Sequence, residues 1–233
     1  MQAFLGLGGG DRRRLAVRHL SLQLGLLTFG AAIAITVRAH LGLTPWDVLH
    51  QGIAGHTPLT IGEASEAVGL VIILASLALG IRPGFATVCN MVLVGFWIDR
   101  VLQTGWVPDA SGAPLVVRFA MLGLSLGLFG LASGAYIAPG LGAGPRDSFM
   151  LAMTMRTGRP VALTRAVVEC AACGLGWLLG GPVGVGTIAT ALLIGPATQA
   201  GFRLFGVDVH RPVTADPAAP PVQCLEEPLA AGA

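Results

Sequence analysis

Six stretches of the chain are apolar and long enough to cross a lipid bilayer. They lie at residues 20–37, 61–79, 85–102, 117–137, 161–179 and 184–205. About 20 helical residues span the roughly 30 Å hydrocarbon core. The runs do not alternate as barrel strands do, and a segment in lipid must satisfy its own backbone groups. The pattern therefore predicts an all-α transmembrane bundle of about six spans.

A motif after the first span predicts a helix break followed by a new helix. Gly42 stops the first helix, Thr44 is suited to capping the next, and Pro45 suits its first position. Asp47 falls in the first turn, where a carboxylate interacts favourably with the free amides and the positive end of the helix dipole. A second helix is expected to begin at Pro45.

The short helices that follow the motifs cannot cross a bilayer. We expect them at residues 45–54 and 145–153, and the first also contains His50 and Gln51. About ten residues cover only half of the hydrocarbon core. Each short helix must lie at the membrane interface or dip into the membrane and return.

The second short segment repeats the first, because Leu41-Gly42-Leu43-Thr44-Pro45-Trp46-Asp47 returns one hundred positions later as Leu141-Gly142-Ala143-Gly144-Pro145-Arg146-Asp147. The same offset pairs Gly30, Gly84, Thr87 and Gly95 with Gly130, Gly184, Thr187 and Gly195. Such self-similarity indicates two copies of one unit. Glu66 aligns with Glu169, so the second copy has about three extra residues, which we place in a loop around Thr154 to Gly158.

The repeat divides the chain into two three-span halves, at residues 20–105 and 117–206. A polar linker at 106–116 joins them, and a polar segment at 1–19 precedes the first. The proline-rich tail at 207–233 has too few apolar residues to fold and is expected to be disordered.

An odd number of spans per half places the second half in the membrane upside down relative to the first. The distribution of arginine agrees with this topology if both termini are cytoplasmic. The cytoplasmic segments then hold Arg12, Arg13, Arg14, Arg18, Arg82, Arg146, Arg156, Arg159, Arg165, Arg203 and Arg211, while Arg38, Arg100 and Arg118 lie outside. Two inverted repeats, with both chain termini in the cytoplasm, are expected.

The first apolar span has a second interpretation, as a cleaved secretory signal. Val37-Arg38-Ala39 is a weak small-residue cleavage site after a basic start. However, the span occupies the place that residues 122–137 occupy in the second half. We therefore expect a retained helix.

Composition excludes several classes of protein. With 54% hydrophobic and 11% charged residues, the chain is too apolar for a soluble domain. A net charge of +2 without a basic stripe argues against a nucleic-acid partner. The sequence holds no Walker loop, nucleophile elbow, HExxH motif or dinucleotide fingerprint, so we expect no enzyme, cofactor or metal. Four cysteines outside loop spacings are expected to be reduced thiols.

The repeated Gly-x-x-Pro-x-Asp motif allows two interpretations. It marks only a helix stop and a capped helix start, or it forms two half-helices that dip in from opposite faces toward a central site. Inverted repeats with interrupted helices are typical of transporters.

Glu66 and Glu169 are matched across the halves and lie within predicted spans. A carboxylate in a membrane is costly, so each is functional, paired or close to water. Arg165 precedes Glu169 by one helical turn and is placed to pair with it. No such partner is local to Glu66.

Several other polar residues favour a structural interpretation. His50 shares a helix face with Asp47, yet Met150 stands at the repeated position, so a surface histidine is favoured over a proton relay or a metal ligand. Asn90 and Gln199 are expected to hydrogen-bond between helices. The Cys170-x-x-Cys173 pair is expected to consist of small packing residues within an apolar helix.

Glycines spaced four apart, at 123/127, 130/134 and 176/180, predict close helix contacts within one chain or between copies.

These motifs are similar to those of a known family. Residues 42–50 (GLTPWDVLH), 60–62 (TIG), 82–84 (RPG) and 98–99 (ID) resemble the YczE-like integral membrane proteins of bacteria, relatives of the YitT group. The likeness covers about residues 20–205 and is looser in the second half, where Arg146 replaces the tryptophan and Gln199 the late aspartate. The resemblance implies a polytopic inner-membrane protein but no substrate, because the family has no established activity.

The sequence favours a small transporter or permease for an unknown solute. Its candidate substrate-binding residues are Pro45, Asp47, His50, Glu66, Pro145, Asp147 and Glu169. The alternative is an accessory or scaffold membrane protein that acts through partners by its glycine faces. A third hypothesis, an intramembrane enzyme, uses His50 and Asp47.

Overall fold

A computed structural model describes residues 12–207, and this part of the chain consists of eight helices without a strand. Six helices are long and apolar enough to cross a membrane: α1 (Arg12–Ala39), α3 (Ile61–Ala78), α4 (Phe85–Thr104), α5 (Leu115–Ile137), α7 (Val161–Leu178) and α8 (Val185–Leu204). Two are short: α2 (Pro45–His56) and α6 (Pro145–Thr157). The predicted all-α bundle with six spans is confirmed.

Most helix boundaries lie within a few residues of the predicted ones, but one prediction was wrong. The expected loop around Thr154 to Gly158 is helical up to Thr157, and the chain turns only at Gly158, where φ is +62°. The first helix begins at Arg12, within the polar start and before the apolar run. Residues 1–11 and the tail predicted to be disordered beyond residue 207 lie outside the described residues.

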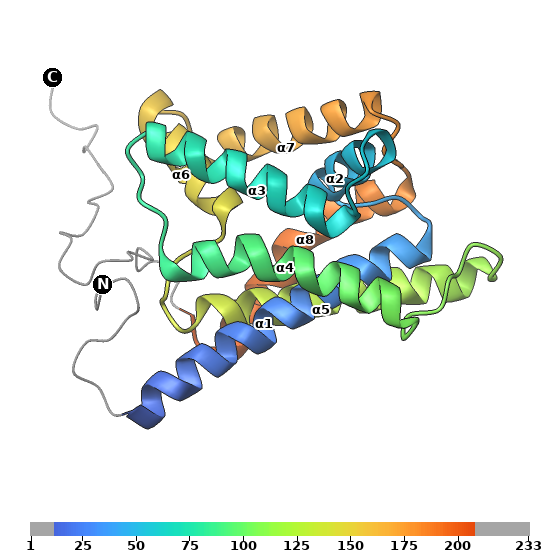
Figure 1. The fold of residues 1–233 in the computed structure, drawn as a ribbon, viewed down its shortest axis with the longest axis horizontal. Helices are drawn as coiled ribbons and strands as arrows, with labels where there is room; N and C mark the ends of the chain where they lie inside the picture. The colour runs from blue at the N-terminus through green and yellow to red at the C-terminus, as the bar shows by residue number, and fades with distance from the viewer. Residues whose placement is uncertain (1–11, 208–233) are drawn as a thin grey trace, which may run out of the picture.

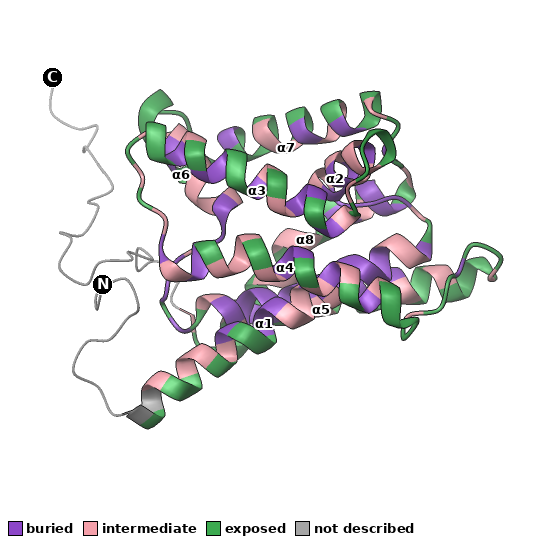
Figure 2. Cartoon of the chain, in the orientation of Figure 1, coloured by how far each residue is buried: buried purple, intermediate pink, exposed green. Residues whose placement is uncertain are grey.

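The helices form two layers, which Figure 1 shows one above the other. In the lower layer, α1 packs along α5, α4 lies against α1, and α8 lies against α5. In the upper layer, α2 contacts α3 and α7, and α6 contacts the same two helices. Burial is concentrated where α1 crosses α5 (Figure 2), which places the first span in the core of the bundle.

Both short helices begin as the motif predicts. Gly42 has φ +106° and Gly142 has φ +121°, a left-handed conformation that glycine adopts without strain. The Thr44 side chain accepts a hydrogen bond from the Asp47 amide at 3.4 Å, and Pro45 occupies the first turn. A capped start with proline in the first turn sets where α2 begins.

Each motif loop is hydrogen-bonded to the start of the last helix of the other half. The Gly186 amide donates to the Leu41 carbonyl at 2.7 Å, and the Ala86 amide donates to the Leu141 carbonyl at 3.0 Å. The two bonds are related by the offset of the sequence repeat, since 41 + 100 = 141 and 86 + 100 = 186. These bonds hold the loops at opposite ends of the bundle (Figure 1).

Glycines permit the closest helix crossings, although only some of the predicted pairs do so. A Cβ on Gly201 of α8 would lie 1.8 Å from the Gly130 carbonyl oxygen, and one on Gly134 would lie 2.6 Å from the Gly201 carbonyl oxygen. A Cβ on Gly176 of α7 would lie 2.4 Å from the Leu49 amide of α2. By contrast, Gly123, Gly127 and Gly180 have nothing within 4 Å.

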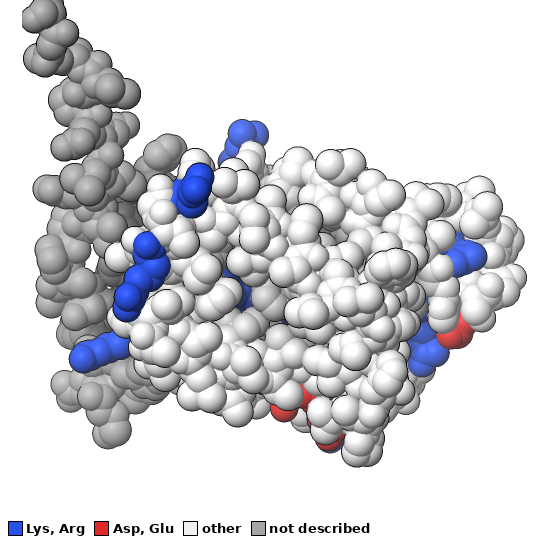
Figure 3. All heavy atoms as spheres, turned by 90° about the horizontal axis from the view of Figure 1, so that it is seen from above, with Lys and Arg blue, Asp and Glu red and all other residues white. Residues whose placement is uncertain are grey.

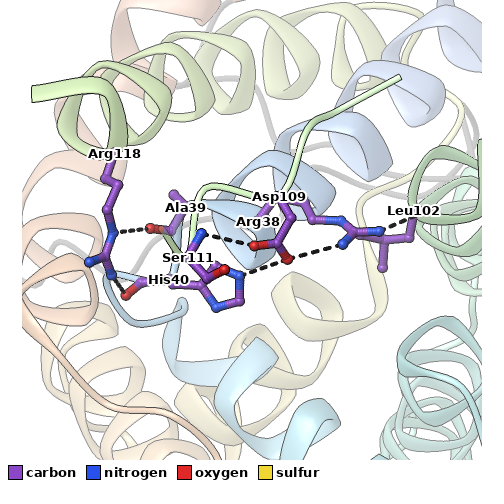
Figure 4. Close-up of polar contacts among 7 residues, drawn as sticks. All are labelled: Arg38, Ala39, His40, Leu102, Asp109, Ser111 and Arg118. Atoms are coloured by element: carbon purple, nitrogen blue, oxygen red, sulfur yellow. Dashed lines mark hydrogen bonds and ion pairs between the residues drawn. The ribbon is translucent and has the colours of Figure 1, made fainter. Parts of the chain in front are cut away.

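The linker between the halves is fixed at one end of the bundle (Figure 4). Asp109 receives hydrogen bonds from Arg38 at 3.1 Å and from the Ser111 amide at 2.8 Å, and the His40 ring lies 3.0 Å from the same carboxylate. Arg118 donates to the Ala39 carbonyl at 2.9 Å and to the His40 carbonyl. These contacts join the end of α1 to the start of α5.

Charged side chains are unevenly distributed between the two ends of the molecule (Figure 3). On the face shown, most basic side chains lie at the left end, where α8 ends and α6 lies in Figure 1. The acidic side chains visible on that face lie away from it. Large exposed apolar residues cover the sides of the bundle, including Leu70, Val71, Leu74, Leu124 and Leu178. An apolar girdle with polar ends matches a protein embedded in lipid.

Candidate ligand-binding cavity

A cavity of about 360 Å³ lies between the two helix layers, beside the first turns of the two short helices. The first residues of both short helices line it: Thr44, Pro45 and Trp46 before and in α2, and Gly144, Pro145 and Arg146 before and in α6. Helix N-termini carry unpaired amides and the positive end of the helix dipole. The two motifs, a hundred residues apart in sequence, thus border the same cavity.

His50 and Asp47 form a fully buried pair at the α2 side of the cavity. Each side chain is 1% exposed, and His50 Nδ1 lies 3.3 Å from Asp47 Oδ1. The approach lacks hydrogen-bond geometry, so both ring nitrogens of His50 are without a hydrogen-bond partner. The Thr44 hydroxyl donates to Asp47 Oδ2 at 2.5 Å.

The shared helix face of His50 and Asp47 is therefore confirmed, and the surface histidine was a wrong prediction. His50 is buried because α2 packs against α7 with glycines at the contact, which brings its buried face inside the bundle. Met150, the repeated position, lines the same cavity. A short polar helix read in isolation does not reveal which neighbour covers it.

Arg146 enters the cavity from the α6 side. Its guanidinium carbon lies 5.0 Å from the centre of the Trp46 ring, a cation–π contact between equivalent positions of the two motifs. Asp47, Asp147 and Glu169 are close enough to act on it electrostatically. Within the described part of the chain, however, Arg146 makes no ion pair or hydrogen bond.

Two further acids of the cavity already have partners. The Tyr136 hydroxyl donates to Asp147 Oδ2 at 3.2 Å. Arg165 donates to Glu169 at 2.9 Å, so the ion pair predicted from helical spacing is confirmed. Both Arg165 and Glu169 line the cavity wall and are partly exposed.

Glu66 is separate from this group. It lies on α3 against α4, where a Cβ on Gly95 would come 2.6 Å from its Cγ. Asp99 is nearby, accepting hydrogen bonds from the Thr60 hydroxyl at 2.5 Å and the Gly62 amide at 3.0 Å. Five of the predicted binding residues line the cavity: Pro45, His50, Pro145, Asp147 and Glu169. Asp47 lies beside His50 without lining the cavity, and Glu66 is also outside the lining.

The sequence did not single out three of the residues that shape the cavity. Trp46, Arg146 and Tyr136 all line it. The motif repeat was the available signal, because positions 46 and 146 correspond and their neighbours meet. Asn90 also lines the cavity and makes no hydrogen bond with any described residue, so its predicted bond between helices was wrong. Gln199 is exposed on α8.

The cavity extends toward one end of the bundle. Phe202 and Val207, at the end of α8, contribute to its lining. At the opposite end, the loop before α2 is bonded to the start of α8, and Gly176 and Gly181 of the second half fit closely against α2. No group of three potential metal ligands occurs among residues 12–207.

A multi-pass helical membrane protein with a central cavity that holds a few charged residues is the class that this fold and site define. Comparison with known proteins places it within that class: residues 16–202 match a family of unknown function, DUF6198, and the chain belongs to it.

Similar proteins occur in Bacillus subtilis and Haemophilus influenzae. The chain is 35% identical to the "Uncharacterized membrane protein YczE" of Bacillus subtilis over 84% of this chain and 92% of the relative. It is 33% identical to an "Uncharacterized protein" of Haemophilus influenzae, over 76% of this chain and 80% of that one. The "Uncharacterized protein YyaS" of Bacillus subtilis is 23% identical over 77% and 89%. The resemblance to the YczE-like family is thereby confirmed. No solved structure matches the chain.

Proposed function

We propose that the protein carries a small solute across the membrane. The observation that carries this proposal is the meeting of two half-helix N-termini, from loops at opposite ends of the bundle, in one cavity. Interrupted helices with this arrangement bind substrate in many secondary transporters. A helix break that served only to end one span would not need a cavity of about 360 Å³ beside it.

The proposal includes an inverted repeat, which two pairs of equivalent contacts support. The loop bonds 41 to 186 and 141 to 86 are one such pair. In the other, a Cβ on Gly30 would lie 2.6 Å from Trp97 Cβ, and one on Gly130 would lie 2.3 Å from the Ala197 carbonyl oxygen, again an offset of 100. Repeated contacts in two halves with odd span numbers favour two units of opposite orientation.

The orientation that we propose places the termini in the bacterial cytoplasm and the linker outside. Arg146 and Arg165 line the cavity, so eleven minus two leaves nine arginines in the cytoplasmic segments against three outside. This excess follows the positive-inside rule. Transport through the bacterial inner membrane, without catalysis, is the activity that this topology supports.

Uptake by reconstituted protein tests the function without knowledge of the solute. Liposomes containing the protein are incubated with a water-soluble extract of bacterial cells, and the solutes retained inside are identified by mass spectrometry. We expect at least one solute to accumulate with the wild type. Met150→Trp fills the cavity and abolishes this accumulation, whereas Met155→Trp, at a position 56% exposed on the same helix, does not. The same solute profile for all three proteins would contradict transport.

One observation favours a second function, that of an accessory protein acting through a membrane partner. Gly123 and Gly127 of α5 have nothing within 4 Å and lie beside the exposed Leu124, so this glycine face is open to another helix. Purification in mild detergent with one stoichiometric partner, lost in a Gly123→Leu variant, would favour this function. A partner retained by Gly123→Leu would exclude this face as the contact.

A further inference from the structure

The charged residues at the cavity differ in whether they have a partner within the protein. Asp47 accepts from Thr44, Asp147 accepts from Tyr136, and Glu169 is paired with Arg165. Arg146 alone among these charged residues has neither an ion pair nor a hydrogen bond in the described chain. A guanidinium carries five N–H donors, and donors left unpaired near a low-dielectric membrane interior are costly. Asp47 Oδ1 also lacks a hydrogen-bond partner, but Asp47 does not line the cavity, so the unpaired charged residue of the lining is a cation.

His50 adds a second unpartnered polar group at the same cavity. Its side chain is 1% exposed, and neither ring nitrogen has a hydrogen-bond partner. It lies on α2, whose N-terminus faces the cavity, while Arg146 lies in the first turn of α6. The N–H donors of Arg146 and the positive ends of both short helices thus border the cavity, beside the unpartnered ring of His50.

The position of Arg146 is constrained by an aromatic ring. The Trp46 ring, 5.0 Å from the guanidinium carbon, covers one face of the group without using its N–H donors. A stacked guanidinium keeps its planar fork free for two parallel hydrogen bonds. Carboxylates match this fork, because their two oxygens accept in the same plane.

The remainder of the cavity is largely apolar. Phe29, Ile72, Met91, Val94 and Ile194 contribute to its walls. These side chains offer no partner to a fully hydrated inorganic ion, but they favour an apolar body attached to a charged group. The volume of about 360 Å³ is within the usual range for sites that bind small organic molecules.

From this geometry we infer that the solute is a small organic anion whose carboxylate binds Arg146 between the N-termini of α2 and α6. This inference rests on the proposed transport function, since it assigns the substrate class of that cavity. The apolar body of the solute lies against Phe29 and its neighbours, and His50 faces the same cavity from the α2 side. The acids nearby remain bound to their protein partners and confine the anion to the arginine.

Ligand-induced stabilisation in mild detergent tests the inference with four probes. Benzoate, benzamide and benzylamine share a ring and differ in charge, and phosphate represents an inorganic oxyanion. We expect benzoate to raise the thermal unfolding midpoint in a saturable manner, because a ligand bound only to the folded state stabilises it. Benzamide, benzylamine and phosphate are expected to give no saturable shift.

Variants at Arg146 locate the site. Arg146→Gln is expected to weaken benzoate binding about tenfold or more, the range for a lost charged hydrogen bond. Arg146→Lys keeps the charge but not the fork, and it serves where the glutamine variant does not fold. The affinity of Arg146→Lys for benzoate is expected to lie between those of the wild type and Arg146→Gln. Arg159→Gln, at an exposed position before α7, is the control and should bind benzoate like the wild type.

Three outcomes would overturn the inference. These are equal stabilisation by benzamide or benzylamine, stabilisation by phosphate without benzoate, and unchanged benzoate affinity in both Arg146 variants. Benzoate binding and solute accumulation in liposomes are measured separately, so the two proposals can fail separately. If benzoate binds through Arg146 but no solute accumulates in liposomes, the anion site stands and transport fails. If the accumulated solutes are cations or neutral molecules, transport stands and the anion assignment fails.

Discussion

Trp46 and Arg146 occupy corresponding places in the two motifs, yet they differ in chemistry and contact each other. In a symmetric pair of half-helices, identical residues here would place two rings or two like charges face to face. Two cations so close would repel, and two rings would leave no charge for a ligand. The departure of the second motif from the first therefore creates an aromatic–cation pair at the centre of the cavity.

Removal of the ring is expected to weaken anion binding. In Trp46→Leu, the guanidinium loses a contact of about 0.5–2 kcal/mol and becomes free to adopt other rotamers. We expect the affinity for benzoate to fall about 2- to 30-fold, measured by the shift of the unfolding midpoint against concentration. Trp106→Leu, at a position 80% exposed in the linker, is the matched control. An affinity unchanged in Trp46→Leu would show that the ring does not position Arg146.

At the residue scale, the sequence predicted which groups are polar but not which neighbours they face. Pro45, Pro145 and Asp147 were found from the motif and Glu169 from its match to Glu66, while the helical spacing of Arg165 and Glu169 predicted their ion pair. The burial of His50 was missed because it depends on α7, more than one hundred residues away in sequence. Local patterns do not contain such contacts.

At the scale of elements, glycine contacts set how closely α5 and α8 cross. Gly201→Ala would place a methyl group against the Gly130 carbonyl oxygen, a contact with backbone that no side-chain rotation relieves. We expect a loss of stability of about 1–3 kcal/mol, the usual cost of overpacking, seen as a lower unfolding midpoint in detergent.

Gly195→Ala provides the control in the same helix. Gly195 has nothing within 4 Å, so the added methyl group meets open space and alanine favours the helix. Its midpoint should equal or exceed that of the wild type. Equal destabilisation by both substitutions would mean that the α5–α8 crossing is looser than the structure describes.

The contacts of Asp109 in the linker predict that the stability of the protein depends on pH. The Ser111 hydroxyl and amide, together with His40 and Arg38, hold the pKa of Asp109 below its usual value. A carboxylate with a lowered pKa contributes stability above its unfolded pKa of about 3.9, and this contribution is lost as the pH falls through the folded pKa.

Comparison of the wild type with Asp109→Asn measures this contribution. The wild type should have the higher unfolding midpoint at about pH 6, and the difference should narrow below about pH 4 as the carboxylate becomes protonated. A difference that stays constant across this range would indicate that the Asp109 contacts do not depend on its charge.

The helices themselves were largely predictable, because apolar length and capping residues are local properties. Thr44 and Pro45 fixed the start of α2. The exception was the end of α6, where the extra residues of the second half were expected to form a loop. They extend the helix instead, because no residue before Gly158 breaks it. A sequence alignment between the halves locates an insertion but does not determine its conformation.

At the scale of the whole molecule, the cavity is sealed more firmly at one end than at the other. Close glycine contacts hold α2 against α7, whereas the lining continues past Phe202 to Val207 at the opposite end. Transport requires that the cavity also open toward the sealed end, by movement of one half relative to the other. Under the transport proposal, this structure is one of two states, and its cavity lining reaches the end that we propose to be cytoplasmic.

Thiol accessibility of the cavity from both sides of the membrane tests this account most directly. A single cysteine is introduced as Met150→Cys in a background without native cysteines, and a membrane-impermeant reagent is applied to spheroplasts and to inside-out vesicles. His56→Cys and Arg156→Cys, at the exposed ends of α2 and α6, report the outer and inner faces. A transporter predicts that position 150 reacts from both sides, that 56 reacts only from outside, and that 156 reacts only from inside. Reaction at position 150 from one side only, or from neither, would contradict solute passage through the cavity.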